Sequence, residues 1–242
     1  MGQIKANFPL GISSGIAVYD DVLDEEFLNS LICHLSEDFD NLFEQGPTIG
    51  GLNTLMKMCM DTEMLNPNKY SSDRVKDLNF YVYANHVVST AMWSCVLDYI
   101  QSYNHLWQAP NVGLTGVRIQ RYFRNHGYYR EHCDGLPWDS VGSNEPTRIL
   151  ASVAYLNTVS DGGGTMFPLH EYTSEAVAGR VVIFPTTWQY PHLGTVPYSS
   201  DKWIVSSFVT STTIPYLPEQ YNQEVQPTDN SVFIYPDNKN ED

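Results

Sequence analysis

Hydrophobic residues recur at helical spacing in two stretches of the first half of the chain. In residues 23–32, Leu, Phe and Ile side chains fall three or four positions apart, which predicts an amphipathic helix after a short apolar strand at 15–19. Asp24 and the acids after it suit the positive end of that helix. A second stretch, from about 84 to 107, predicts a longer helix with one face packed on a sheet.

Residues 44–76 lack such a pattern. They are rich in Gly, Asn, Met and charged residues and show no steady period. We interpret them as a long loop, for which a surface excursion is the commoner explanation and a flap over a site is the alternative.

From residue 113 onward the pattern changes to short apolar or alternating segments separated by turn residues. Segments at 116–123, 149–156, 180–184 and 203–209 predict β-strands. The 16 Tyr and 10 Phe residues, with charged residues at only 17%, agree with a β-rich chain. The predicted fold class is therefore mainly β with flanking helices.

The length of 242 residues fits a single domain with one sizeable core. We expect that domain to span 1–214, with its core at about 113–210. Residues 215–242 are acidic and contain prolines, and we expect them to form a tail along the surface or to be partly disordered.

Charge narrows the range of partners. A formal net charge of −15 disfavours a nucleic-acid partner. No basic segment followed by an apolar one opens the chain, and no run approaches about 18 apolar residues, so we expect a soluble, cytoplasmic protein without a membrane partner. The four cysteines contain no CxxC pair and are expected to be free thiols: Cys33, Cys59, Cys95 and Cys133.

A candidate metal site begins with His132 and Asp134. On a strand, residues two apart share one face and lie about 7 Å apart along the backbone, so both side chains can reach one ion. His192, 58 residues after Asp134, comes just after an apolar strand at 181–184, at a place where a neighbouring barrel strand could meet the strand of His132. Two histidines and a carboxylate are the facial ligand set of non-haem Fe(II) oxygenases, although zinc could occupy the same ligands.

Lys202 is a candidate for binding an anion. It enters a strand that is otherwise apolar, and a buried ammonium is costly unless it is paired. A dicarboxylate held at the metal would satisfy it, whereas a lysine at a strand entrance with its ammonium in water is the alternative.

Further residues follow one another in a recognisable order between about 114 and 210. They are Gly127, Tyr129, His132, Asp134, Arg148, Tyr155, Leu156, Asn157, Gly162, Gly163, Gly164, Thr165, Phe167, Pro168, Gly179, Phe184, His192, Gly194, Pro197, Lys202 and Trp203. In this order they resemble the catalytic core of the prolyl 4-hydroxylase group of Fe(II)- and 2-oxoglutarate-dependent oxygenases.

The resemblance implies a double-stranded β-helix, or cupin-like jelly roll. It implies that His132, Asp134 and His192 are the catalytic metal ligands for Fe(II). Lys202 would bind the distal carboxylate of 2-oxoglutarate, with Tyr122 and, as a second candidate, Tyr155 also bonding it.

The resemblance also implies that Tyr129, Arg148 and Trp203 face the substrate. A packing role is the alternative for Tyr155 and Trp203, since both lie in apolar, strand-like runs. The implied substrate is a prolyl residue in a peptide or protein, because proline-rich segments are already extended before they bind.

The implied activity is that of a dioxygenase of the procollagen-proline 4-dioxygenase type. It uses O2 and converts 2-oxoglutarate to succinate and CO2 while hydroxylating a C–H bond, and ascorbate is a candidate reductant. The alternatives are the same chemistry on another side chain, a free amino acid or a small molecule, and a jelly-roll binding module without activity.

The chain departs from the collagen-type pattern at two positions. Ala151 stands where a Thr often follows the arginine, and Phe208 stands where a second Trp often follows the lysine. We expect these departures to affect the choice of substrate more than the use of cofactors.

Overall fold

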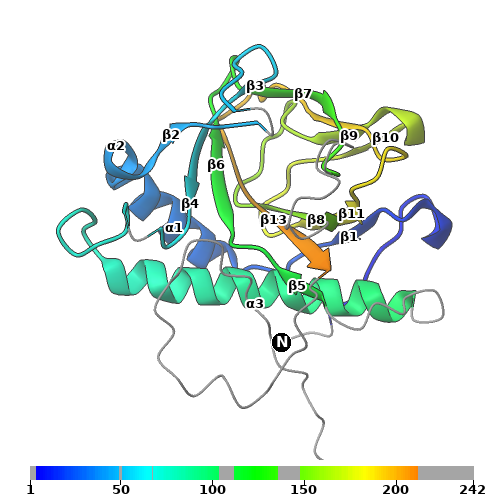
Figure 1. Ribbon diagram of the computed structural model, residues 1–242, viewed down its shortest axis with the longest axis horizontal. Helices are drawn as coiled ribbons and strands as arrows, with labels where there is room; N and C mark the ends of the chain where they lie inside the picture. The colour runs from blue at the N-terminus through cyan, green and yellow to red at the C-terminus, as the bar shows by residue number, and fades with distance from the viewer. Residues whose placement is uncertain (1–3, 49–50, 67, 104–111, 136–147, 212–242) are drawn as a thin grey trace, which may run out of the picture.

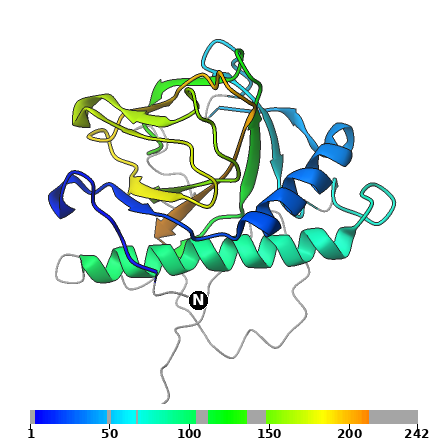
Figure 2. The same ribbon diagram turned by 180° about the vertical axis from the view of Figure 1, so that it is seen from behind.

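Two antiparallel sheets face each other in a computed structural model, which describes residues 4–48, 51–66, 68–103, 112–135 and 148–211. The segments predicted as strands at 15–19, 116–123, 149–156, 180–184 and 203–209 all contribute to the larger sheet. Figures 1 and 2 show the arrangement from opposite sides. The helices are α1 (Glu25–Glu37), α2 (Phe39–Leu42) and α3 (Leu78–Ser102), with 3-10 turns at Ile12–Ser14 and Pro168–His170. The strands are β1 (Ala17–Tyr19), β2 (Glu44–Gln45), β3 (Lys57–Met58), β4 (Met60–Glu63), β5 (Val112–Leu114), β6 (Arg118–Tyr122), β7 (Tyr128–His132), β8 (Arg148–Tyr155), β9 (Thr165–Phe167), β10 (Tyr172–Ser174), β11 (Val181–Pro185), β12 (His192–Gly194) and β13 (Lys202–Ser211).

The larger sheet has β13 at its centre. Its order is β1-β11-β8-β13-β6-β4-β2, and β5 also pairs with β13. Lys202 lies opposite Tyr122 on β6, and Ile204 lies opposite Tyr155 on β8. Because side chains alternate across a strand, Lys202 and Trp203 point to opposite faces of this sheet.

The smaller sheet carries the candidate metal ligands. Its order is β10-β9-β12-β7-β3, and the register places His192 of β12 opposite His132 of β7. The predicted meeting of these two strands is therefore confirmed. Asp134 comes two residues after the end of β7, so the His-x-Asp pair lies partly beyond the strand on which we expected it.

Helices cover the outer face of the larger sheet. Figure 1 shows α3 running along the side of this sheet that faces away from the smaller one. The side chain of Asp24 accepts a hydrogen bond from the backbone N–H of Phe27, and Asp77 does the same for Phe80. Asp77 makes α3 begin at Leu78, six residues before the predicted start, because its side chain satisfies a backbone N–H that the first turn leaves unpaired.

Two groups of buried residues form the core. The larger lies between the helices and the larger sheet and includes Leu31, Met92 and Val205. The smaller lies between the two sheets and includes Phe167 and Phe184. Since the smaller group surrounds His192, packing in the sandwich fixes the position of a candidate ligand.

The interpretation of 44–76 as one continuous loop is wrong in part. This segment contributes β2 and β4 to the larger sheet and β3 to the smaller one. These strands are only two to four residues long, and the buried polar or charged residues Lys57, Asp61 and Thr62 interrupt any apolar alternation. The predicted tail at 215–242 lies outside the described residues. Within the ranges described, no helix is long and apolar enough to cross a membrane.

Candidate active site

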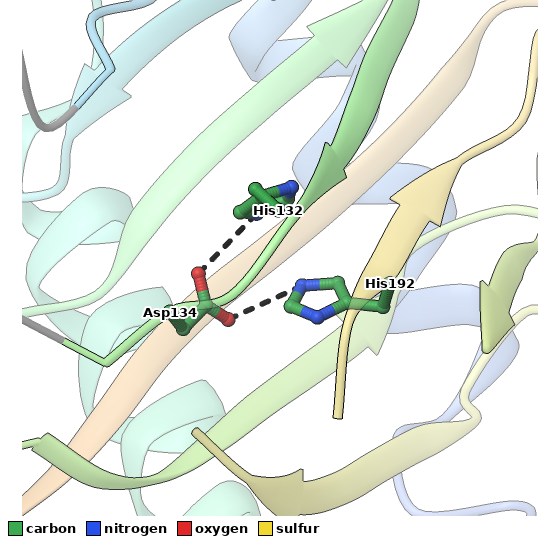
Figure 3. Close-up of side chains that lie close together, drawn as sticks. All are labelled: His132, Asp134 and His192. Atoms are coloured by element: carbon green, nitrogen blue, oxygen red, sulfur yellow. Dashed lines mark ion pairs between the residues drawn. The ribbon is translucent and has the colours of Figure 1, made fainter. Parts of the chain in front are cut away.

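His132, Asp134 and His192 converge on one point. One carboxylate oxygen of Asp134 lies 3.4 Å from Nε2 of His132, and the other lies 3.3 Å from Nε2 of His192 (Figure 3). The candidate ligand atoms of all three residues lie within 4.8 Å of one another. The three residues predicted as ligands therefore form a single cluster at the ends of β7 and β12.

The hydrogen bonds of the two histidines favour a metal at this point. Nδ1 of His132 lies 2.8 Å from the carbonyl of Arg130, and Nδ1 of His192 lies 3.1 Å from the carbonyl of Tyr190. A carbonyl only accepts, so each Nδ1 carries a proton, and each Nε2 presents a lone pair to a metal when its ring is neutral. Two lone pairs then face a carboxylate, and either protons or one cation must lie among them. This donor set fits Fe(II).

Burial and charge act together on the cluster. Burial alone would raise the pKa of Asp134, but hydrogen bonds and charge from the two histidines outweigh it and lower that pKa well below its usual range. Burial lowers the pKa of His192, and the Asp134 carboxylate outweighs this and raises it. Asp134 is therefore ionised at neutral pH, as a metal ligand must be.

Aromatic rings hold both imidazoles in place. The ring of Tyr129 stacks on His132 with centroids 3.6 Å apart, and Phe184 meets His192 edge-on at 4.6 Å. Phe184 and its neighbour Phe167 are completely buried. The histidine rings therefore have little freedom to turn.

A cavity of about 230 Å³ opens beside the cluster. Its wall includes the three candidate ligands and four further residues that the sequence singled out, which are Tyr122, Tyr129, Arg148 and Lys202. Ala151 and Phe208, where the chain departs from the collagen-type pattern, also line it, and the guanidinium of Arg148 lies 3.9 Å from the centre of the Phe208 ring.

Lys202 is buried in the wall of this cavity. Its side chain is 2% exposed, and its ammonium lies 4.3 Å from the centre of the Tyr122 ring. Among the described residues, no carboxylate lies within 4 Å of this ammonium, and burial lowers the pKa of Lys202 to about 8. A buried ammonium without an anion is costly, so the position suits an anionic ligand.

The backbone around Lys202 is held by Asn157. The side-chain amide of Asn157 donates to the carbonyl of Asp201 at 2.8 Å and accepts from the N–H of Trp203 at 2.8 Å. Asp201 also pairs with Arg121 at 2.7 Å. These contacts fix both residues that flank Lys202 at the start of β13.

Tyr155 and Trp203 lie outside the cavity lining. The hydroxyl of Tyr155 shares a hydrogen bond of 2.7 Å with Thr165. Trp203 is 4% exposed and packs on the helix side, edge-on to Phe43 and under the guanidinium of Arg121. This placement agrees with packing, the alternative considered for both residues. Trp203 does not face the cavity because it alternates with Lys202, which does.

Several residues of the cavity wall were not predicted from the sequence. Lys57, Arg118 and Gln120 line it, and Gln120 accepts a hydrogen bond from the Tyr122 hydroxyl at 2.8 Å. Arg118 and Gln120 alternate with Ile119 in a predicted strand, so their side chains share the face of Tyr122. That alternation was a usable signal for two of them, whereas nothing in 44–76 pointed to Lys57.

One family of known proteins matches part of the chain. Residues 117–210 match the family described as the 2OG-Fe(II) oxygenase superfamily, in which 2OG is 2-oxoglutarate. This match confirms, for the β core, the resemblance seen in the sequence, and together with the ligand cluster it supports Fe(II) and 2-oxoglutarate as cofactors. No curated protein sequence matches the chain.

Solved structures of prolyl hydroxylases are similar in fold. The viral collagen prolyl hydroxylase of Paramecium Bursaria Chlorella virus-1, in complex with 2-oxoglutarate, is 16% identical, with a TM-score of 0.57 over 82% of this chain and 97% of that one. A prolyl-4-hydroxylase of Pseudomonas putida is 16% identical, with a TM-score of 0.57 over 83% and 94%. A Trichoplax adhaerens prolyl hydroxylase, in complex with a hypoxia inducible factor peptide fragment, is 14% identical, with a TM-score of 0.57 over 82% and 84%. The predicted double-stranded β-helix fold is confirmed.

Proposed function

We propose that this protein is an Fe(II)- and 2-oxoglutarate-dependent dioxygenase that hydroxylates a prolyl residue in a peptide or protein. The observation that carries the proposal is the presence, in one cavity, of the His132, Asp134 and His192 cluster and the buried Lys202. The matched superfamily supports the oxygenase chemistry, and the prolyl hydroxylases of similar fold support the substrate.

In this proposal each residue has a separate task. His132, Asp134 and His192 hold Fe(II), which together with 2-oxoglutarate supplies the activation of O2. Lys202 binds the distal carboxylate of 2-oxoglutarate by a charge-assisted hydrogen bond. The ring of Tyr122 lies against this ammonium and keeps water from it.

The remaining residues of the wall orient the substrate. Tyr129 and Arg148 line the cavity next to the ligands, where an aromatic face and a guanidinium can bind a proline ring and a peptide carbonyl. A bound peptide closes the open side of the cavity and excludes water from the reacting C–H bond. The protein thus positions the target while the cofactors supply the oxidation.

Succinate release tests the oxygenase, and peptide mass tests the substrate. Fe(II)-loaded protein is incubated with 2-oxoglutarate and O2, with and without proline-containing peptides, and both products are measured in the same tubes. We expect succinate and a gain of one oxygen atom on proline, with neither from Asp134→Ala. Succinate without oxidised peptide would reject the prolyl substrate, and no succinate from folded, Fe(II)-bound protein in any tube would reject the oxygenase.

A further inference from the structure

A group of charged side chains lies in the cavity wall beside the candidate ligands. Lys57 on β3 and Arg118 on β6 line the cavity, and Asp61 on β4 lies between them. The side chains of Lys57 and Asp61 are 5% and 1% exposed, and that of Arg118 is 33% exposed. Ionised groups are this deeply buried only when they are paired or take part in function.

On the side that faces the cavity, this group carries more positive than negative charge. Lys57 lies 3.6 Å from the Asp61 carboxylate, Arg118 forms an ion pair with the same carboxylate, and Gln120 donates to it at 3.1 Å. Lys57 also donates to the carbonyl of Pro47 at 3.4 Å. Arg118 also forms an ion pair with Glu63 at 3.8 Å, but that carboxylate is half exposed to solvent and does not line the cavity. On the cavity side, two cations and an amide therefore share one anion.

The cofactors do not neutralise this surplus. An Fe(II) ion held by one carboxylate carries one net positive charge, Lys202 adds a second, and 2-oxoglutarate brings two negative charges. That set is neutral by itself. The positive charge at Lys57 and Arg118 is also local, since the chain as a whole has a formal charge of −15. An anion from the remaining ligand, the substrate, would balance it.

The position of Lys57 limits where that anion sits. Its ammonium lies 5.0 Å from the centre of the Tyr129 ring, and this ring stacks on His132 at 3.6 Å. Lys57 is therefore no more than about 9 Å from the imidazole of a candidate ligand. An extended peptide covers that distance in about three residues.

We propose that Lys57 and Arg118 form a subsite for a carboxylate of the substrate, which is an acidic residue within about three positions of the target proline. The proposal rests on the function proposed above and names the class of peptide. Lys57 lies on β3, outside the residues that match the superfamily. This selectivity would thus come in part from β3, which pairs with β7 at the edge of the smaller sheet.

Peptide binding tests the subsite without turnover. Two peptides are compared that differ only in Glu against Gln, placed two residues from the single proline. Their binding to protein loaded with Fe(II) and 2-oxoglutarate is measured by fluorescence anisotropy without O2. We expect the Glu peptide to bind about tenfold more tightly, since a charge-assisted hydrogen bond contributes that order of free energy.

Variants assign the preference to its residues. Lys57→Met, and separately Arg118→Gln, should lose most of the preference for the Glu peptide, and Lys57→Arg should keep it. Lys76→Met is the matched control, because Lys76 forms an exposed ion pair with Glu37, and it should leave the preference intact. Thermal unfolding of each variant shows that it is folded.

The outcomes separate this proposal from the proposed function. The subsite is overturned if both peptides bind equally or if neither binds. It is also overturned if the Lys57→Met protein keeps its preference for the Glu peptide but needs more 2-oxoglutarate. Admission of air to the same samples then tests the function. If the Glu peptide binds more tightly but its proline is not hydroxylated, the subsite is supported and the prolyl substrate is rejected. If both peptides bind equally and are hydroxylated equally, the prolyl substrate is supported and the subsite is rejected.

Discussion

Asn157 bonds to the backbone on both sides of Lys202. Its side-chain amide donates a hydrogen bond to the carbonyl of Asp201 and accepts one from the N–H of Trp203, each of 2.8 Å. Lys202 is the first residue of β13, where a strand end would otherwise fray. These two hydrogen bonds therefore fix the direction in which the Lys202 ammonium enters the cavity.

Removal of the Asn157 side-chain amide should weaken the binding of 2-oxoglutarate. We expect Asn157→Ala to raise the KM for 2-oxoglutarate by roughly tenfold, since two hydrogen bonds of about 1 kcal/mol each no longer hold the backbone of Lys202. Fe(II) affinity should be unchanged, because the ligands lie on other strands. Both are measured on the same preparation, by succinate release and by metal titration.

Asn41→Ala is the control for this variant. Its amide also donates to a backbone carbonyl, that of Arg74, at 3.0 Å, but it does not line the cavity. A similar rise in KM in both variants would show a general loss of stability and would contradict a positioning role for Asn157.

Loss of a candidate ligand should abolish metal binding while the fold remains. We expect His132→Ala and Asp134→Ala to lose Fe(II) binding and succinate release, because two of the three protein ligands do not hold the ion in place. Unfolding by urea should change little. His170→Ala, which removes a partly exposed histidine outside the cluster, should behave like the unaltered protein. Retained activity in the first two variants would disprove the metal assignment.

The affinity for 2-oxoglutarate should depend on pH through Lys202. Burial lowers the pKa of this ammonium to about 8 in the protein without ligand. Below that pH the group is charged and attracts the distal carboxylate, and above it the free protein has lost the proton. We therefore expect the KM for 2-oxoglutarate to rise as the pH increases from 8 to 9, by up to tenfold.

Two variants check the origin of this dependence. Lys202→Arg stays charged over this range, so its KM should no longer rise between pH 8 and 9. Lys202→Ala should have a high KM at every pH. A steep rise that persists in Lys202→Arg would assign the titration to another group.

Trp203 should contribute to stability and not to substrate binding. It is buried against Phe43 and Arg121 on the helix side of the sheet. Trp203→Ala should lower the free energy of unfolding by about 3–5 kcal/mol, measured with urea. Trp203→Phe should be folded with an unchanged KM for peptide. A large rise of that KM in folded Trp203→Phe would instead support the substrate role implied by the resemblance.

Residues 113–210 were predictable because their signals reinforce one another. The period of two in the strands, the His-x-Asp pair and the apolar run before His192 all indicate the same core. The sequence predicted that a strand at His192 meets the strand of His132, but the register that places the two histidines opposite each other comes from the structure. Lys202 was found because a charge in an apolar strand is costly.

The remaining features depend on packing that no local pattern reveals. Strands of two residues, such as β3, exist because β7 offers them an edge, so 44–76 looked like a loop. Lys57 and Asp61 are buried because they pair with each other and because Asp61 also pairs with Arg118, 57 residues further along the chain. Trp203 was expected at the substrate because the resemblance gave its place in the sequence but not the face of β13 on which it lies.

The candidate ligands and the lysine belong to different sheets. His132 and His192 lie on β7 and β12 of the smaller sheet, whereas Lys202 starts the central strand of the larger one. A dicarboxylate that reaches from the ion to Lys202 would connect the two sheets through its own carbon chain. Its binding free energy would then oppose any separation of the sheets. Amide hydrogen exchange should slow in both sheets together when the ligand binds, and the melting temperature should rise with its concentration.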